Sequence, residues 1–422
     1  MTRKLAFLSG APRTSTKPVA SLTGGRQHIL GTVSGFKENG WQVDTYILGD
    51  KVPESWLKGE HEMNKGKPFI TRLAADVVRI LISAQHIRRA LKNIPAPDWV
   101  YERYAAYQLF GYFFQRRGAP WILETNDAVF NQATSELKHV ALPFLVRWAE
   151  KFAYRQCDVL VVISENLRQI LVTQLQIPPE KIVVVPNAAD TQTFNPNSVH
   201  PRRLFDDETF VIGFQGAMYK WAGLDYLVHA IAILRNAGLN VGAVLLGDGH
   251  ERKHLEALAA ELGIASHIIC PGRVPRELVP EYIAGYDLCY SGQINWNTSA
   301  MYLSPLKLYD YMAMGKPVIA SRFADAINVT KGGRLGYLYA PEDLHDLVAA
   351  ATRAYNDRSR LPEMGAAARA EILANHTWAR RVHDFITTAE ELLLRKSRLE
   401  AKGERLASVD NPIGAESCGC DF

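Results

Sequence analysis

Residues 304–321 read SPLKLYDYMAMGKPVIAS, and this stretch predicts a short helix that turns directly into a buried strand. Ser304 is suited to the N-cap of the helix, and Pro305 to its first position. Gly315 and Pro317 end the helix before the apolar residues that follow. The stretch is therefore one helix–strand unit of an α/β protein, and similar units recur on both sides of it.

Lys307 falls in the first turn of this helix. Free N–H groups and the positive end of the helix dipole favour an anion there, so a lysine costs a few tenths to about 1 kcal/mol. One interpretation is a solvated lysine paired with Asp310 on the same helical face. The other is a cation that holds a phosphate together with the helix N–H groups, while Asp310 binds the hydroxyls of a ribose.

Short apolar segments alternate with amphipathic helical segments almost throughout the chain. The first half contains KLAFLSG, WQVDTYIL, DWVYER, PWILETND, DVLVVIS and KIVVVPNAAD, and the second contains FVIGFQG, VGAVLLGDG, HIICPGRV, YDLCYSG and KPVIAS. This order predicts two doubly wound, Rossmann-like α/β domains with parallel sheets. Because such sheets bind ligands beyond the carboxyl ends of their strands, we expect the two domains to face a cleft.

The length of 422 residues also favours two domains over one. A segment rich in Pro, Asn and Asp separates the two sets of strands. We expect an N-terminal domain over residues 1–190, a C-terminal domain over 205–376, and a mobile polar tail over 396–422.

The composition is that of a soluble globular protein, with 47% hydrophobic and 22% charged residues. The formal net charge of +4 suits anionic small molecules or a loose association with anionic lipid, and it is too small for a nucleic-acid-binding protein. No stretch has the pattern of a signal peptide or a membrane span, and the five cysteines show neither metal nor disulfide spacing. The sequence predicts a cytoplasmic protein.

Glycine-containing loops follow three strands of the second half. In FVIGFQGAMYKWAGLDYL, Gly216 permits close approach to a phosphate and Lys220 supplies a charge, although a plain glycine turn with a solvated lysine fits as well. Asp248 is placed to cap the helix that follows it. The loop at Arg273 either flanks a nucleotide base or simply connects two elements. Together with Lys307, these loops favour a nucleotide site in this half.

The same half contains His250, Glu251 and His254 in the H-E-x-x-H spacing of zinc peptidases. A zinc hydrolase is therefore an alternative. The pattern is short, His250 falls at the start of the helix, and the stretch LEALAAELG that follows offers no further histidine to complete a site.

In the first half, LTGGRQHILG places Gly24 and Gly25 before a helix whose N–H groups would face the cleft. The glycines do not form G-x-G-x-x-G, so a dinucleotide site is not supported. Two stretches, YERYAAYQLFGYFFQRRGAPW and LPFLVRWAEKFAYRQC, combine aromatic and basic residues. Helix packing explains such aromatics, and the alternative is contact with the inner face of a membrane or with a lipid-linked substrate.

The ordered series of motifs resembles glycosyltransferase family 4, the retaining nucleotide-sugar transferases of GT-B fold. It runs over about residues 1–390, from the GG loop through VVISENLRQIL, KIVVVPNAADTQTFNP, LLGDGHERKHLEALAAELGI, CPGRVPRELVPEYIAGYDL and SPLKLYDYMAMGKPVIAS to GRLGYLYAPEDL and TWARR. The resemblance implies a donor nucleotide on the C-terminal domain and a sugar or lipid-linked acceptor on the N-terminal domain. It also implies that a helix over 377–395 returns to the N-terminal domain.

The residues and the resemblance together define an expected site, with no metal and no cofactor. Lys307, Lys220 and Asn126 are expected at the reaction centre. The expected donor-binding residues are Gly24, Gly25, Gly216, Asp248, Arg273, Val274, Ser304, Pro305, Leu306 and Asp310. The expected acceptor-side residues are Glu102, Arg103, Glu124 and Asp127.

The sequence departs from the family pattern at several positions. Tyr302 replaces the first Glu of the usual Glu-x7-Glu, and Asp310 replaces the second. Ala217 and Ala222 stand where the family tends to carry Arg and Lys, and Asn126 where many relatives place His. These departures leave open a homologue that binds a nucleotide sugar without catalysis.

Overall fold

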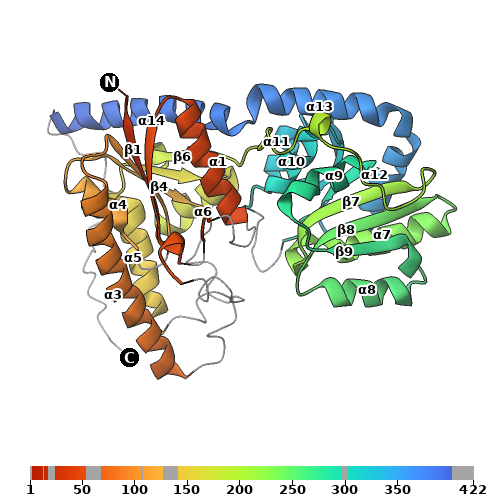
Figure 1. Cartoon of the computed structure of the whole chain (residues 1–422), viewed down its shortest axis with the longest axis horizontal. Coiled ribbons are helices and arrows are strands. Elements are labelled where there is room, and N and C mark those ends of the chain that lie inside the picture. The colour runs from red at the N-terminus through yellow and green to blue at the C-terminus, as the bar shows by residue number, and fades with distance from the viewer. Residues whose placement is uncertain are drawn as a thin grey trace, which may run out of the picture.

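The computed structural model describes residues 2–12, 14–17, 24–53, 68–105, 108–126, 141–295 and 302–401. They form two lobes, each built on a six-stranded parallel sheet (Figure 1). The sheet of the N-terminal lobe has the order β2-β1-β3-β4-β5-β6. Its strands are β1 (Lys4–Ser9), β2 (Gln42–Ile47), β3 (Trp99–Arg103), β4 (Trp121–Thr125), β5 (Val159–Val162) and β6 (Ile182–Val184).

The sheet of the C-terminal lobe has the order β12-β11-β10-β7-β8-β9. Its strands are β7 (Phe210–Ala217), β8 (Val241–Asp248), β9 (Ile268–Gly272), β10 (Leu288–Ser291), β11 (Val318–Ser321) and β12 (Gly336–Tyr339). Every segment that the sequence predicted as a strand forms one, and two doubly wound Rossmann-like domains are confirmed. The prediction missed β12, a short edge strand that pairs only with β11.

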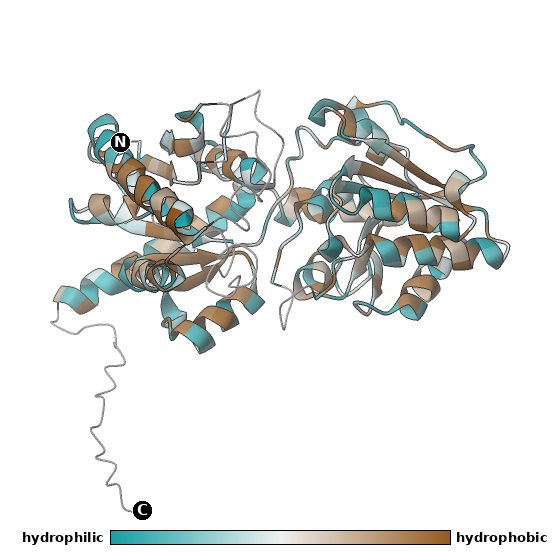
Figure 2. Ribbon diagram, turned by 90° about the horizontal axis from the view of Figure 1, so that it is seen from below, coloured by the Kyte–Doolittle hydropathy of each residue, from teal (hydrophilic) through white to brown (hydrophobic). Residues whose placement is uncertain are grey.

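Helices cover both faces of each sheet. In the N-terminal lobe they are α1 (Gly24–Glu38), α3 (Phe69–Asn93), α4 (Phe110–Gln115), α5 (Pro143–Gln156) and α6 (Glu165–Leu175). In the C-terminal lobe they are α7 (Leu224–Asn236), α8 (Arg252–Glu261), α9 (Val279–Ala284), α10 (Leu306–Ala313), α11 (Ala324–Val329), α12 (Leu344–Asn356) and α13 (Leu361–Asn375). The strands are mainly hydrophobic and the helices carry both hydrophobic and hydrophilic faces (Figure 2), as sheets buried on two sides require.

The last helix, α14 (Trp378–Ala401), leaves the C-terminal lobe and lies along α1 of the N-terminal lobe (Figure 1). Its residues Val382, Phe385 and Ala389 join the hydrophobic core formed by α1 and the first sheet. The predicted tail from 396 is wrong at its start, because the helix continues to Ala401 and Lys396 forms an ion pair with Asp158. The remainder of the predicted tail lies outside the described residues.

Gly31 on α1 allows α14 to approach closely. A Cβ atom at this position would lie 2.1 Å from Cε2 of the Trp378 ring. We expect Gly31→Ala to lower the free energy of unfolding by about 1–3 kcal/mol, since a buried ring must move. Urea unfolding would measure this, with Gly24→Ala on the same helix as the comparison, because a Cβ atom there would make only an ordinary contact, 3.7 Å from Cδ1 of Leu306. An equal loss in both variants would contradict the packing argument.

Candidate functional site

The candidate site lies where the strand order of the C-terminal sheet reverses. Strand β7 has β8 on one side and β10 on the other, and Gly216 lies near its carboxyl end. Doubly wound sheets bind ligands at this kind of position. The first turn of α10 meets β7 here, because a Cβ atom on Gly216 would lie 3.1 Å from Nζ of Lys307.

Lys307 is buried, with only 9% of its surface exposed. Its Nζ lies 3.8 Å from the centre of the Phe214 ring and 5.7 Å from that of Trp221. In the described part of the chain this amine has no carboxylate partner, and burial lowers its pKa to about 7. A buried ammonium without a counter-ion is costly unless an anion binds beside it. The unfavourable lysine in the first turn is therefore a real feature of the fold and not a solvated surface residue.

The first turn of α10 also faces the N-terminal lobe. A Cβ atom on Gly24, the first residue of α1, would lie 3.7 Å from Cδ1 of Leu306. The N-terminal ends of α1 and α10 therefore approach each other across the lobes. Arg103 supports this arrangement by donating from Nη1 to the carbonyl oxygen of Gly25 at 2.7 Å. Two helix N-termini and Lys307 thus offer positive potential in one place.

Ser304 does not cap α10, which corrects the sequence prediction. The helix begins at Leu306, Pro305 occupies the cap position, and no side chain caps it. The Ser304 hydroxyl instead donates to Oδ2 of Asp325 at 2.8 Å and accepts the N–H of Asn187 at 3.0 Å. A hydroxyl suited to capping is used to join α10 to the segment that connects the lobes.

Asp310 lies one turn after Lys307 and is also buried, at 8% exposed. Burial raises its pKa to about 7, against the opposing charge of Arg276. The side chain of Gln215 approaches it, with Nε2 at 3.4 Å from Oδ2. Arg276 in turn pairs with Asp190 at 2.8 Å. Lys307, Gly216 and Asp310, all predicted from the sequence, are thus brought together by β7 and α10.

A buried chain of polar contacts joins the two lobes beside this site, and the sequence did not predict it. His28 on α1 bonds through Nδ1 to Oδ1 of Asn187 at 2.6 Å. The Nδ2 of Asn187 donates to the Ser304 carbonyl at 2.5 Å, which fixes the orientation of the amide. On its other side, Nε2 of His28 lies 2.8 Å from Oε1 of Glu124. A histidine at the third position after a glycine pair gave no signal distinguishable from an ordinary core residue.

Glu124 is part of this buried series of polar contacts and does not lie on an acceptor surface, contrary to the prediction. It is 1% exposed, and its Oε2 accepts the Tyr101 hydroxyl at 2.6 Å. Burial acts to raise its pKa, but the charge and hydrogen bond of His28, with Arg103 and Tyr101, lower it to about 2. Glu124 is therefore an ionised structural residue that anchors His28.

Glu102 is also corrected from an acceptor-side residue to a structural one. Its two carboxylate oxygens accept the N–H groups of Phe110 and Gly111 at 2.9 and 2.8 Å, at the start of α4. The side chain is fully buried, and burial raises its pKa to about 7. It cannot reach an acceptor. The third predicted acceptor-side carboxylate, Asp127, lies outside the described residues.

Two further predicted residues have partners of their own. The Nζ of Lys220 forms an ion pair with Asp225 at 3.0 Å, so its role at the reaction centre stays a prediction. Asp248 does not cap α8, which begins at Arg252. Its Oδ1 accepts the N–H of Gly249, and its Oδ2 lies 3.7 Å from Nε of Arg273. Next to Arg273, Val274 packs partly buried against the core of the C-terminal lobe.

The H-E-x-x-H alternative is wrong for the described part of the chain. His250 and Glu251 precede α8 and only His254 lies within it, so the two imidazoles do not share a helical face. Among the described residues, no group of three His, Cys, Asp or Glu side chains is arranged to hold a metal ion. The ring of His250 packs beside that of Tyr219 instead.

The positions that depart from the family pattern differ in their burial and in their contacts. Tyr302 is buried among core residues of the N-terminal lobe, and its carbonyl accepts the hydroxyl of Ser164 at 2.6 Å. Ala222 is buried and Ala217 is exposed. Asn126 follows the end of β4, and its buried Oδ1 has no hydrogen-bond partner among the described residues.

Comparisons with known families agree with this geometry. Residues 22–193 match the family model described as Glycosyltransferase Family 4, and residues 209–357 match the model described as Glycosyl transferases group 1. The two matches follow the two lobes and cover most of the chain. The chain belongs to glycosyltransferase family 4.

Individual relatives are distant. The chain is 22% identical to an alpha-D-kanosaminyltransferase of Streptomyces kanamyceticus over 70% of this chain and 72% of that protein. It is 25% identical to an MMP alpha-(1->4)-mannosyltransferase of Mycolicibacterium hassiacum, over 60% of each chain. A D-inositol 3-phosphate glycosyltransferase of Corynebacterium jeikeium is 29% identical, over 47% of this chain and 49% of that one. The chain thus spans less than two thirds of the last two relatives.

Solved structures share the fold over nearly the whole chain. Sucrose-phosphate synthase from Thermosynechococcus elongatus superposes with a TM-score of 0.66 at 17% identity, covering 93% of this chain and all of that one. HepE of Anabaena, solved in complex with UDP and glucose, gives 0.62 at 17% identity, covering 94% of this chain and all of that one. This glycosyltransferase therefore has the GT-B fold.

Proposed function

We propose that this glycosyltransferase transfers a sugar, with retention of configuration, from a nucleoside-diphosphate sugar to a sugar or lipid-linked sugar acceptor. We also propose that the reaction needs no metal ion. The observation that carries the proposal is the buried amine of Lys307, which has no acidic partner in the described part of the chain and lies beside Gly216. Lys307 is in the first turn of α10, whose N-terminal end approaches that of α1. A diphosphate would supply the missing negative charge.

The proposed chemistry follows from where the charge develops. As the bond between the sugar and the diphosphate breaks, negative charge builds on the departing phosphate oxygens, and preorganised cations and N–H groups stabilise it. Lys307 and the N–H groups at the start of α10 would act in this way. The acceptor hydroxyl would pass its proton to the leaving phosphate oxygen on the same face of the sugar, so no protein nucleophile is required.

Asp310 and Asn126 have complementary proposed roles. The carboxylate of Asp310 would accept hydrogen bonds from the ribose hydroxyls, since it lies one turn from Lys307 on α10. Asn126 would present its unpartnered Oδ1 to the sugar from the N-terminal lobe. The distant relatives with mannosyl-, glucosyl- and inositol-related names support a sugar donor without identifying it.

A thermal-shift screen of UDP, GDP, ADP, CMP and dTDP and their sugars tests the proposal. A ligand at a hundred times its dissociation constant adds about 2.7 kcal/mol to stability, so even modest affinity is visible. We expect one base to raise Tm in the wild type and not in Lys307→Met. Product analysis with EDTA present then tests retention and metal independence. Binding without turnover on any acceptor would favour the non-catalytic alternative, and no binding at all would overturn the proposal.

The pKa of Lys307 predicts how donor binding depends on pH. In the empty site the pKa is about 7, and a bound diphosphate raises it because an opposite charge favours the ammonium form. Binding therefore takes up a proton above pH 7, and affinity for the nucleoside diphosphate should fall from about pH 7 to about pH 9, by at most tenfold per pH unit. Asp310, with a pKa of about 7, is ionised over most of this window.

Isothermal titration in buffers of different ionisation enthalpy measures that proton uptake. Lys307→Arg keeps its charge over the whole window and should show almost no pH dependence. A wild-type affinity that stays constant from pH 7 to pH 9 would contradict the assignment of Lys307 to the diphosphate.

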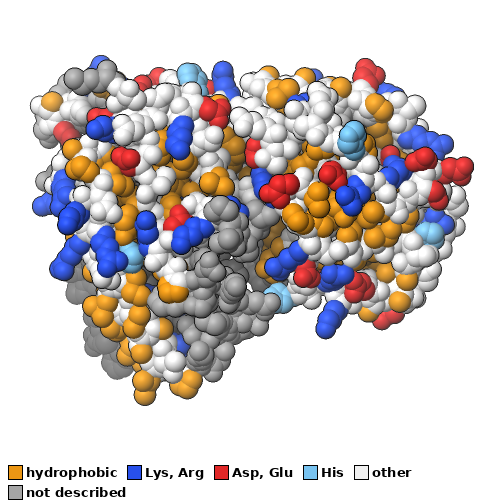
Figure 3. Space-filling model, in the orientation of Figure 1, with side chains coloured by type: hydrophobic (Ala, Val, Ile, Leu, Met, Phe, Trp, Pro, Cys, Tyr) orange, Lys and Arg blue, Asp and Glu red, His pale blue; other side chains and the backbone are white. Residues whose placement is uncertain are grey.

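We further propose that the N-terminal lobe contacts an anionic membrane surface. No helix in the described ranges is long and apolar enough to cross a membrane. Nine large hydrophobic side chains are nevertheless exposed on neighbouring helices α3, α4 and α5: Phe69, Ile70, Val77, Val78, Ile80, Leu81, Phe113, Phe144 and Trp148. Hydrophobic side chains gather at the lower end of this lobe and basic ones lie above them (Figure 3). Aromatic and basic residues side by side are typical of membrane-surface helices.

Co-sedimentation with vesicles tests this surface. We expect the wild type to bind vesicles that contain phosphatidylglycerol and not vesicles of phosphatidylcholine alone. Phe144→Ser with Trp148→Ser should lower binding at least tenfold, since these side chains are 68% and 62% exposed and bury area only on contact. Leu394→Ser, on α14 and 59% exposed, is the control. Equal loss in the control, or no binding by the wild type, would contradict the proposal.

A further inference from the structure

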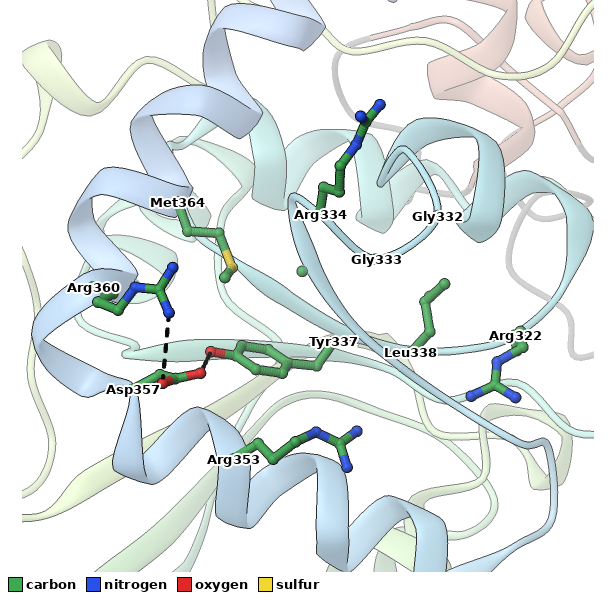
Figure 4. Close-up of a pocket in the computed structure, with 11 residues that line it drawn as sticks. Arg322, Gly332, Gly333, Arg334, Tyr337, Leu338, Arg353, Asp357, Arg360 and Met364 are labelled. Atoms are coloured by element: carbon green, nitrogen blue, oxygen red, sulfur yellow. Dashed lines mark hydrogen bonds and ion pairs between the residues drawn. The ribbon is translucent and has the colours of Figure 1, made fainter.

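A second hollow, outside the candidate site, lies on the C-terminal lobe. It has a volume of about 720 Å³ and is bounded by β12, the loop before it, α12 and the turn that leads to α13. Figure 4 shows Tyr337 and Leu338 in its floor, with arginines around them. None of its lining residues belongs to the candidate site.

Four arginines surround this hollow from different elements. Arg322 follows β11, Arg334 lies in the loop before β12, Arg353 is on α12, and Arg360 lies in the turn before α13. In Figure 4, Arg353 and Arg360 lie on one side and Arg322 on the opposite side. Residues that the sequence separates by up to 38 positions, from 322 to 360, thus line one hollow, although the Arg334 side chain points away from the other three in Figure 4.

Nearby carboxylates do not balance this charge. Asp357 accepts the hydroxyl of Tyr337 at 3.0 Å, and its other oxygen is 4.0 Å from Arg360. Asp346 lies 3.6 Å from Arg322 and also accepts the N–H of Ala340. Two acids, each already bonded to a neutral donor, therefore stand among four guanidinium groups.

Arg334 and Arg353 have no acidic partner at all within the described part of the chain. Elsewhere on this lobe most exposed arginines have one. Examples are Arg202 with Glu281 at 3.0 Å and Arg252 with Glu256 at 2.9 Å. Unpaired positive charge is thus concentrated at the hollow, where it creates a local positive potential.

From this arrangement we propose that the hollow binds an anion carrying two or more phosphate groups. Guanidinium groups bind phosphate oxygens in pairs of parallel hydrogen bonds, and they do so better than lysine. Because the arginines stand on opposite sides of an open hollow, a chain of phosphates satisfies more of them than a single phosphate does. The apolar side chains of Leu338 and Met364 leave room for an organic group attached to the phosphates. A soluble polyphosphate and a phosphorylated lipid headgroup both offer this chemistry.

Calorimetric titration with inorganic tripolyphosphate at low salt tests the proposal. Lys307→Met serves as the starting protein, so that the candidate donor site does not contribute. We expect stoichiometric binding that weakens as salt is added, because the contacts are exposed charges. Adding Arg353→Gln and Arg360→Gln should weaken the binding at least about tenfold. Both changed arginine side chains are exposed, so the fold of the starting protein should be retained, which circular dichroism would verify.

Arg358 offers a matched control. It lies in the same turn as Arg360, and its guanidinium packs over the ring of Tyr355, 4.9 Å from the ring centre, instead of lining the hollow. Arg358→Gln removes the same charge as Arg360→Gln and should change the affinity less than about twofold. No detectable binding of tripolyphosphate, or equal weakening by Arg358→Gln and Arg360→Gln, would overturn the proposal.

Binding to vesicles that contain phosphatidylinositol bisphosphate distinguishes a soluble polyphosphate from a phosphorylated lipid headgroup as the natural ligand. If the natural anion is soluble, the two arginine changes weaken tripolyphosphate binding and leave vesicle binding unchanged. If it is a lipid headgroup, the same changes also reduce vesicle binding, and tripolyphosphate competes with the vesicles. Both results support a phosphate-binding hollow and assign its source.

Discussion

Replacing Lys307 with methionine should lower kcat by about a hundredfold to a thousandfold, the usual cost of removing one preorganised charge from a reaction centre. The amine has no acidic partner in the described part of the chain, and it lies against Phe214 and Trp221 beside Gly216. Initial-rate kinetics with the identified donor would measure the loss. A fall in kcat larger than the rise in KM would locate the interaction in the transition state.

The same variant should remain folded and be as stable as the wild type or more so. Methionine has a similar length, and it removes the cost of burying an ammonium group. Because the folded pKa of about 7 lies below the unfolded value, the wild type should gain stability as pH rises from 7 to about 10, and the variant should not. Urea unfolding at both ends of this range tests the sign of the effect.

Lys316→Met is the control for the kinetic result. This lysine follows the other end of α10, where its Nζ donates to the carbonyl of Tyr286 at 2.8 Å. Its loss should leave kcat within about twofold once stability is corrected, because it is at the opposite end of the helix from the positive dipole. Full activity of Lys307→Met would reject the assignment of Lys307 to the reaction centre.

The second large effect is expected from His28. His28→Gln should lower the free energy of unfolding by about 3–5 kcal/mol, since Glu124 would be left as a buried carboxylate without its main counter-charge. Because the same residue holds Asn187 and, through it, Ser304, we also expect weaker donor binding. His86→Gln, which removes a buried histidine bonded to Tyr46, should destabilise by about 1–2 kcal/mol without changing donor affinity.

A double-mutant cycle measures the interaction energy between His28 and Glu124. His28→Gln with Glu124→Gln should cost less than the sum of the single changes, by about 2 kcal/mol. The pKa of Glu124, about 2, lies below its unfolded value of about 4.5. The pair therefore contributes its full stability above about pH 4.5, and about 3 kcal/mol is lost as pH falls toward 2. Additive single changes, or a Glu124→Gln variant with the same acid sensitivity as the wild type, would show that the pair is not coupled.

Features with a strong local pattern were predictable. Buried parallel strands are continuous apolar runs, so β1 and β7 stand out in the sequence. Lys307 was identifiable because it breaks a local rule in the first turn of α10. Edge strand β12 was missed because only β11 pairs with it, and a short strand buried on fewer sides has a weaker pattern.

The sequence pattern was misleading where a side chain has more than one possible partner. Ser304 and Asp248 are both good helix caps, yet Ser304 bonds to Asp325 and Asn187, and Asp248 bonds to Gly249. Glu102 lies near the carboxyl end of β3, as a ligand-binding carboxylate would, and in the fold it holds the start of α4. Local rules identify the hydrogen-bonding capacity of such groups but not which distant group uses it.

The sequence by itself determined the two Rossmann-like domains, and it predicted a nucleotide site in the second with Lys307 and Asp310 at its centre. These depend on periodicity, turn chemistry and the helix dipole, which act within a few residues. Only the tertiary structure decided that Lys307 is buried without an acidic partner among the described residues, that His28 joins Glu124 to Asn187, and that four arginines line one hollow. Those properties arise from contacts between residues far apart in the chain, and their energies depend on burial, which no local pattern specifies.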